Sequence, residues 1–217
     1  MSKSEETRKK ISETALASFR ERGYEQTTLR LIAAEAGVSV GNAYYYFPSK
    51  NHLVQELYSR VQEQHSKRVI SALKGEPDIA KRLRIALDLG LDGLEPYHST
   101  APGFLSAAIG PTSAVSPFGE DAAAPREAAI EVFQLVVDGS KNSIPSFLKK
   151  RLPHLLWLAY MGLSLYWVYD LTPGQKKTRT LVRKGSKLFG QMLPLARLPL
   201  MRKPITDLLD LFEEAQQ

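Results

Sequence analysis

Apolar residues recur every three or four positions along most of this chain, and that spacing restricts it to helices. Ile11, Ala15 and Phe19 fall four residues apart. Leu53 and Leu57 repeat the interval further along. Apolar side chains at this period share one face of an α-helix. No stretch alternates apolar and polar residues as a half-buried strand does, and no internal repeat occurs. The sequence therefore predicts an all-α fold.

Glycine, proline and hydroxyl residues indicate where the first helices begin and end. Gly23 follows the first helix, Gly37 the second and Pro48 the third. Thr28 and Ser39 stand where their side chains would cap the second and third helices. The later elements are a long helix after Ser49, a turn at 76–78, a loop at 110–125, and helices at 79–94, 126–140, 150–170, 175–194 and 204–214.

Composition narrows the class of protein. Hydrophobic residues make up 43 % of the 217 residues. This is enough for one ordinary domain, or for a small domain joined to a larger one. The absence of cysteine excludes disulfides and thiolate metal sites. His98 and His154 stand alone, so we expect no metal site and no cofactor. The polar start lacks an apolar signal segment and favours a cytoplasmic protein.

Positive charge is concentrated in the last third of the chain. The net charge is +6, and residues 141–203 carry thirteen Lys/Arg against one acid, Asp170. An excess of cations suggests an anionic partner. Four cations share one side of the helix expected at 175–194: Lys176, Arg183, Lys184 and Lys187. This side is most simply a solvated face. The alternative is a second anionic surface, such as membrane lipid or flanking DNA.

The segment 151–171 is apolar for nearly the length that spans a bilayer. A membrane-anchored binding protein is therefore one alternative. Against it, the segment contains His154, Ser164 and three tyrosines, and Asp170 stands near its end. A helix buried on all sides at the centre of a bundle fits better, and we expect no membrane partner.

A short pair of helices near the N-terminus predicts a helix-turn-helix. Gly37 lies between them, and the second helix of such a unit occupies the DNA major groove. That helix ends in three tyrosines at 44–46, whose side chains point 100° apart, so at least one faces solvent or a partner. Gly41 lowers helix stability by roughly 1 kcal/mol relative to alanine. A glycine there leaves room for an approaching surface.

Residues 7–57 read TRKKISETALASFRERGYEQTTLRLIAAEAGVSVGNAYYYFPSKNHLVQEL and resemble the N-terminal domain of the tetracycline-repressor (TetR) family. The ordered motifs are GY, TT, IAAEAGVS, YYYF and SK. The resemblance covers about a quarter of the chain. It implies a homodimer that binds operator DNA through a domain at 1–50. A helical domain at 51–217 would bind a small effector, mainly apolar, and dimerise.

The resemblance also implies roles for individual residues. Arg30 is the best placed for a guanine contact, and Lys50 would hold a phosphate. Tyr44 and Tyr46 are expected to face DNA, with Tyr45 partly packed. The complete set of expected DNA-binding residues is Thr28, Arg30, Ser39, Val40, Gly41, Asn42, Tyr44, Tyr45, Tyr46 and Lys50.

Two further sets are expected in the C-terminal part. Aromatic residues and a methionine would line an effector pocket, although at helical spacing such residues also form plain core: Phe118, Phe133, Trp157, Tyr160, Met161 and Tyr166. One apolar side of the helix at 175–194 would form the dimer interface with the helix at 150–170: Leu181, Gly185, Leu188, Phe189 and Met192.

The sequence thus favours a ligand-responsive transcriptional regulator. The family resemblance implies that it is a repressor. An enzyme using the C-terminal cavity is the other alternative, but the chain has no Cys nucleophile, HExxH, GxSxG or phosphate-binding glycine loop. The effector and the operator sequence are not encoded in any motif.

Overall fold

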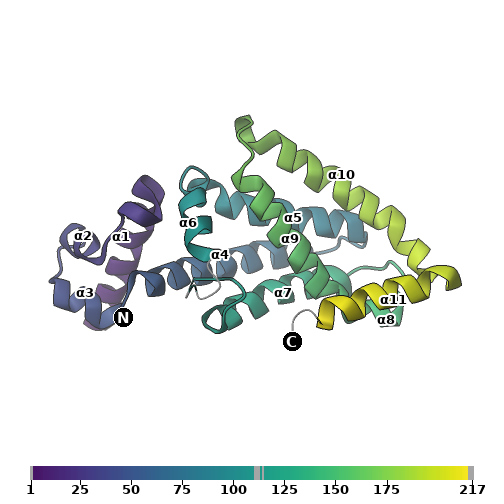
Figure 1. The fold of residues 1–217 in the computed structure, drawn as a ribbon, viewed down its shortest axis with the longest axis horizontal. Helices are drawn as coiled ribbons and strands as arrows, with labels where there is room; N and C mark the ends of the chain where they lie inside the picture. Colours follow the sequence, from purple (N-terminus) through teal and green to yellow (C-terminus); the bar gives the residue numbers. More distant parts are fainter. Residues whose placement is uncertain (1, 110–112, 114, 215–217) are drawn as a thin grey trace. The chain divides into compact units, whose positions relative to one another are not determined.

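The computed structural model describes residues 2–109, 113 and 115–214, and these residues contain helices and no strand. The predicted all-α fold is therefore confirmed for this part of the chain. The described residues form two compact units. The first unit comprises residues 1–64 and 93–127, and the second comprises residues 65–92 and 128–217. The long helix α4 (Lys50–Ala72) contributes residues to both (Figure 1). The predicted boundary at residue 50 remains a prediction.

Besides the start of α4, the first unit contains helices that come before and after α4 in the chain. They are α1 (Lys3–Gln26), α2 (Leu29–Glu35), α3 (Val40–Tyr46), α6 (Ala101–Ala108) and the 3-10 turns η1 (Glu95–Tyr97) and η2 (Glu120–Ala122). One apolar core joins them, with Ile11, Phe19, Ile32 and Phe47 almost fully buried. Helix α1 is not regular to its end, because Gly23 adopts a φ of +78° within it.

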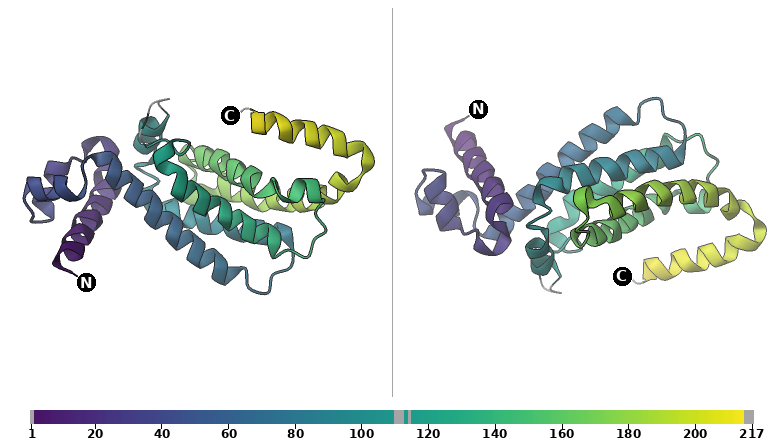
Figure 2. Two further views of the ribbon diagram at one scale, coloured as in Figure 1. Left: turned by 90° about the horizontal axis from the view of Figure 1, so that it is seen from below. Right: turned by 90° about the horizontal axis from the view of Figure 1, so that it is seen from above.

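The second unit is a bundle of longer helices (Figure 2). Besides the end of α4, it contains most of α5 (Ile79–Leu94) and α7 (Ala123–Asp138), together with α8 (Ser146–Lys149), α9 (Leu152–Val168), η3 (Pro173–Gln175), α10 (Lys176–Met192), η4 (Leu193–Arg197) and α11 (Pro199–Glu214). None of the described helices is long and apolar enough to cross a membrane. The apolar segment at 151–171 is helix α9, whose Leu156, Trp157 and Tyr160 are buried.

Several boundaries and elements differ from the expectation. The loop expected to run to residue 125 ends earlier, because α7 begins at Ala123, and the Arg126 Nη1 donates to the carbonyl oxygens of Pro117 and Gly119 at 3.1 and 3.0 Å. Helices α6 and α8 were not predicted. Helix α11 begins at Pro199 rather than residue 204, with Pro204 inside it. Proline fits the first helical position, which Pro199 takes, whereas Pro204 inside the helix has no backbone N–H to donate.

The buried Arg82 of α5 joins the ends of two other helices. Its guanidinium donates to the carbonyl oxygens of Leu135 and Val136 in α7, at 2.7 and 2.9 Å. It also donates to those of Leu73 and Glu76, just beyond α4, at 3.0 and 2.7 Å. The last carbonyl groups of a helix have no partner within it. One side chain therefore supplies donors to the C-terminal ends of α4 and α7.

Replacing Arg82 with methionine should lower the free energy of unfolding by about 3 kcal/mol or more, since each buried acceptor left without a donor costs about 1–3 kcal/mol. Urea unfolding followed by circular dichroism measures the change. Arg84→Met is the control on the same helix, because the exposed Arg84 pairs with Asp88 across one helical turn at the surface. Equal losses in the two variants would contradict this role for Arg82.

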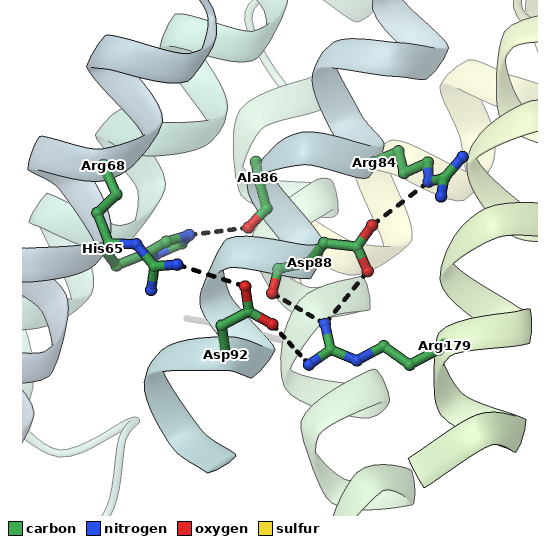
Figure 3. A network of polar contacts seen from close by, with 7 residues as sticks. All are labelled: His65, Arg68, Arg84, Ala86, Asp88, Asp92 and Arg179. Carbon is green, nitrogen blue, oxygen red and sulfur yellow. Dashed lines mark hydrogen bonds and ion pairs between the residues drawn. The ribbon is translucent and has the colours of Figure 1, made fainter. Parts of the chain in front are cut away.

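His65 is a buried titratable group between α4 and α5. Its Nε2 donates to the Ala86 carbonyl oxygen at 2.9 Å (Figure 3). Its ring also stacks on that of Tyr160, with the centroids 6.0 Å apart. Burial lowers the pKa of His65; the Ala86 bond opposes the shift, and the charge of Arg68 adds to it. The unfolded chain therefore binds a proton more readily than the folded chain below the ordinary histidine pKa of about 6.5.

The free energy of unfolding should consequently fall as the pH drops below about 6.5. The His65→Gln variant keeps an N–H donor but does not titrate, so its stability should depend less on pH in this range. Urea titrations at pH 7.5 and 5.0 test this, with His52→Gln at an exposed position as the control. Wild type and His65→Gln losing equal stability would show that another group causes the pH dependence.

Candidate DNA-binding site

Helices α2 and α3 form the predicted helix-turn-helix, and side-chain caps fix where each begins. The Thr28 Oγ1 accepts from the Leu31 N–H at 3.2 Å, and the Ser39 Oγ accepts from the Asn42 N–H at 3.1 Å. Gly37 occupies the turn with a φ of +63°, in the left-handed region that glycine enters without steric cost. The two caps and the glycine turn predicted from the sequence are therefore present.

Helix α3 divides into a packed side and an exposed arc. Ala43 and the following Phe47 are almost fully buried in the core of the first unit. The exposed arc consists of Val40, Gly41, Asn42, Tyr44 and Tyr45. A helix of seven residues is marginal by itself, so its packed side holds it in place. The arc is left available for a partner.

The three tyrosines divide differently from the expectation. Tyr45, expected to be packed, is 79 % exposed, whereas Tyr44 is 47 % exposed. Tyr46, expected to face DNA, packs partly against the core, and its hydroxyl lies 3.0 Å from the Ser4 Oγ of α1. The partial packing expected for Tyr45 was therefore wrong, and the DNA-facing role of Tyr46 remains a prediction. At 100° per residue, Tyr46 falls nearer to the buried Ala43 side than Tyr45 does.

Gly41 has open space beside it. A Cβ built on this residue would have no heavy atom within 4 Å. Its φ is not in the left-handed region either, since the positive-φ glycines are Gly23, Gly37, Gly75 and Gly174. Neither the packing nor the backbone of the described chain requires a glycine at this position. Any requirement for a small residue there comes from outside the protein.

Of the remaining expected DNA-binding residues, Thr28 and Arg30 are exposed at the start of α2. Lys50 is placed differently, because its ammonium turns toward the end of α1. The Lys50 Nζ donates to the Tyr24 carbonyl oxygen at 2.9 Å and lies 3.8 Å from the centroid of the Tyr24 ring. The structure therefore does not bring Lys50 to the exposed arc.

The residues expected to line an effector pocket differ in how far they are buried. Phe118 and Tyr166 are exposed, while Phe133, Trp157 and Tyr160 are buried core. Burial raises the pKa of the Tyr160 hydroxyl to about 12. The second unit has open hollows of about 460 Å³ beside Arg82 and about 420 Å³ beside Phe147 and Arg151. None of the expected residues lines either of these two hollows, so the effector pocket remains a prediction.

Helix α10 exposes the side expected to dimerise. Leu181, Leu188 and Met192 are about half exposed, and Gly185 is exposed between them. Phe189 is half-buried and does not belong with these four. The side of α10 that packs within the unit was missed, because it is formed by small and polar residues: Thr178, Val182 and Ser186. Their spacing of four residues is the signal that would have revealed it.

Arg179 holds α10 on α5 by ion pairs. Its Nη2 lies 2.6 Å from an Asp92 carboxylate oxygen, and its Nη1 lies 3.3 Å from one of Asp88 (Figure 3). Arg68 of α4 pairs with the same Asp92 at 3.3 Å. Arg179 therefore belongs to a network shared by three helices, unlike Lys176, Arg183, Lys184 and Lys187, which are exposed.

Comparisons with known proteins cover both parts of the chain. A family described as "Bacterial regulatory proteins, tetR family" matches residues 11–57, and one described as "Tetracyclin repressor-like, C-terminal domain" matches residues 82–212. Among curated relatives, the HTH-type transcriptional repressor KstR of Rhodococcus jostii is 44 % identical over 55 residues, 25 % of this chain and 26 % of that protein. The HTH-type transcriptional regulator TtgR of Pseudomonas putida is 44 % identical over 61 residues, 28 % and 29 % of the two chains.

These matches span only about a quarter of the curated relatives' length. Solved structures extend the similarity at the level of fold. A TetR transcriptional regulator from Nitrosomonas europaea aligns with a TM-score of 0.63 and 17 % identity, over 83 % of this chain and 96 % of that one. FadR of Thermus thermophilus, described in complex with lauroyl-CoA, aligns with a TM-score of 0.56 and 22 % identity, over 81 % and 92 %. The C-terminal family match alone covers more than half of the chain. The chain belongs to the TetR family of transcriptional regulators, which are DNA-binding proteins and not enzymes.

Proposed function

We propose that this protein is a cytoplasmic repressor that binds a pseudo-palindromic operator as a homodimer and leaves it when a small, mainly apolar molecule binds. The observation that carries the proposal is the exposed arc of α3. Five positions of a short, well-anchored helix are free of core packing, and open space surrounds Gly41. A helix of this kind can enter the major groove and read base edges.

The arc supplies the chemistry for recognition. Asn42 offers an amide that can pair with adenine, and Tyr44 and Tyr45 offer rings for sugar and thymine methyl groups with hydroxyls for phosphate. Arg30 of α2 is exposed and can make a two-donor contact to guanine. The Thr28 and Ser39 hydroxyls accept the cap bonds and still have a proton to donate to phosphate.

The outward side of α10 supports dimerisation. Leu181, Leu188 and Met192 form an apolar stripe, and Leu165 and Tyr169 of the neighbouring α9 region are also exposed. Exposed apolar side chains in such numbers mark an interaction surface. Two copies related by a two-fold axis would bury these surfaces against each other. They would then present two recognition helices to successive major grooves, as a pseudo-palindrome requires.

The aromatic core of the second unit supports an apolar effector. Phe133 and Tyr160 pack with ring centroids 5.9 Å apart, and Trp157 is buried nearby on α9. An effector entering here has to separate these rings, with the half-buried Met161 at the edge. It releases the operator only if it binds the opened form more tightly, and operator DNA then weakens effector binding by the same factor.

Selection of duplexes from a random pool tests the operator proposal, and Gly41→Ala tests the arc. In the free protein this change should raise helix stability by up to about 1 kcal/mol, because alanine is the better helix former and meets no neighbour. Affinity for the selected operator should nevertheless fall tenfold or more, since the methyl group projects into the interface. Fluorescence anisotropy gives the affinity and urea unfolding the stability, with the exposed Ser59→Ala as control. Unchanged operator affinity for Gly41→Ala would remove α3 from the interface.

Dimerisation is tested by Leu188→Glu. A carboxylate placed in an apolar interface loses its hydration, so the variant should sediment as a monomer at micromolar concentration while the wild type sediments as a dimer. Leu200→Glu is the matched control, since Leu200 is exposed on α11 outside the stripe. A monomeric wild type, or a dimeric Leu188→Glu, would contradict the proposed interface.

A further inference from the structure

Arg82 has one N–H group without an acceptor in the part of the chain that the structure describes. A guanidinium carries five N–H donors, and four of them meet the carbonyl oxygens given above. The second N–H of the Arg82 Nη2 is left over. The residue is only 6 % exposed, and no described carboxylate pairs with it. A buried cation with an unused donor is a place where an anion can bind.

The unused donor borders the hollow of about 460 Å³ in the second unit. Arg82 and Gly139 both line this hollow, and a Cβ at Gly139 would collide with the guanidinium. The absence of a side chain at Gly139 therefore leaves room for the Nη2 at the wall. The Lys141 N–H donates to the Pro77 carbonyl oxygen at 2.9 Å, which holds the segment after α7 beside the turn after α4. The volume lies in the range of small-molecule sites.

The lining of the hollow combines cations with apolar side chains. Lys74 and Lys141 are exposed there, and neither has an ion-pair partner among the residues that the structure describes. Ile70 and Leu135 also line the hollow and are 50 % and 40 % exposed, although both are large apolar residues. Cations beside exposed apolar surface suit a ligand that has a negative charge and an apolar body.

One acid, Glu76, belongs to the same lining. Its Oε1 accepts from the Asp78 N–H at 2.9 Å, and its Oε2 lies 3.9 Å from the Lys81 Nζ. Both oxygens thus contact groups that are not part of the lining. Three cations and this one acid leave the lining with a net charge of +2. The hollow therefore still attracts an anion.

We propose that this hollow binds a small carboxylate that carries an apolar chain. The carboxylate accepts the unused N–H of Arg82 and pairs with the ammonium groups of Lys74 and Lys141. The chain lies on Ile70 and Leu135. None of the buried aromatic residues to which the effector is assigned above lines this hollow, so the site is a second one and does not depend on the proposed function.

Glycine signals allow binding to be observed at the site itself. Gly75 and Gly139 line the hollow, whereas Gly41 of α3 and Gly185 of α10 do not. The probe is sodium hexanoate, and the matched control is hexanol, which has the same chain without the charge. Each is titrated into protein whose glycines alone carry an NMR-active nitrogen isotope.

We expect hexanoate to shift the amide signals of Gly75 and Gly139 and to leave those of Gly41 and Gly185 in place. Millimolar affinity is the scale expected of so small a probe. Hexanol should bind about tenfold more weakly, because it cannot form charge-assisted hydrogen bonds. Acetate should also bind more weakly than hexanoate, because it has almost no apolar surface to bury.

Variants test the two parts of the lining separately. Lys141→Glu should weaken hexanoate binding about tenfold, because it turns an attraction into a repulsion. Lys74→Glu repeats this test on the α4 side. Lys203→Glu, an exposed position on α11 outside the hollow, is the matched control and should bind like the wild type. Ile70→Gln should weaken hexanoate and leave acetate unchanged, since acetate has no chain to place there.

Unmoved signals of Gly75 and Gly139 in the wild type would overturn the proposal. Hexanol binding as tightly as hexanoate, or unchanged hexanoate affinity in both lysine variants, would overturn it too. Urea unfolding supplies a second measurement, because a ligand that binds only the folded chain raises its stability. Hexanoate should raise the urea midpoint of the wild type more than that of Lys141→Glu. Equal increases in the two proteins would place the bound hexanoate elsewhere.

Discussion

One guanidinium supplies hydrogen-bond donors to the free carbonyl groups at the ends of two helices, and the arrangement of the second unit depends on it. Arg82 lies in α5 between the C-terminal ends of α4 and α7 and donates to four carbonyl oxygens there. A Cβ at Gly139 would collide with this guanidinium, which explains a glycine directly after α7. Burying a cation is costly unless its donors are matched by acceptors, and these four acceptors are all backbone oxygens. The ends of α4, α5 and α7 are thus fixed together by a polar group at the edge of an apolar bundle.

A second buried charge fixes the start of α10. The Asp170 carboxylate accepts from the backbone N–H and hydroxyl of Thr172 and from those of Thr178. Burial raises the pKa of Asp170, but these four bonds outweigh that effect and hold the pKa well below its usual range. Gln175 precedes α10 in the left-handed region with no side-chain cap bond. Asp170, five residues before Gln175, therefore caps α10 in its place. This bond at the first turn fixes which side of α10 faces outward.

Much of the DNA-binding unit could be predicted from sequence because its signals are local. The caps at Thr28 and Ser39 and the turn at Gly37 depend on residues within a few positions of each other. The contact between the Tyr46 hydroxyl and α1 could not be predicted in the same way, since it depends on where Ser4 lies, 42 residues from Tyr46. Lys50 is a similar case, because the sequence gives no sign that its ammonium meets Tyr24.

The second unit was predicted less completely for the same physical reason. Helical periodicity located α9 and α10, but it identified the stripe of large residues on α10 and not the buried stripe of Thr178, Val182 and Ser186. Small polar residues carry little hydrophobic signal, and their burial follows from close approach of α5, where a Cβ at Gly190 would lie 2.7 Å from the Ala80 Cβ. The aromatic residues in 150–170 were compatible with a packed core and with a pocket lining. Their spacing alone does not distinguish the two.

The separation of α3 into a packed side and an exposed arc has a consequence for how such a regulator changes over time. Ala43 and Phe47 maintain the fold, whereas the arc contributes almost nothing to the core. Substitutions in the arc would therefore change the proposed DNA contacts without a matching loss of stability. A duplicated copy of the gene would then need only a few such changes to gain a new operator, while the proposed dimer interface and effector site stay the same.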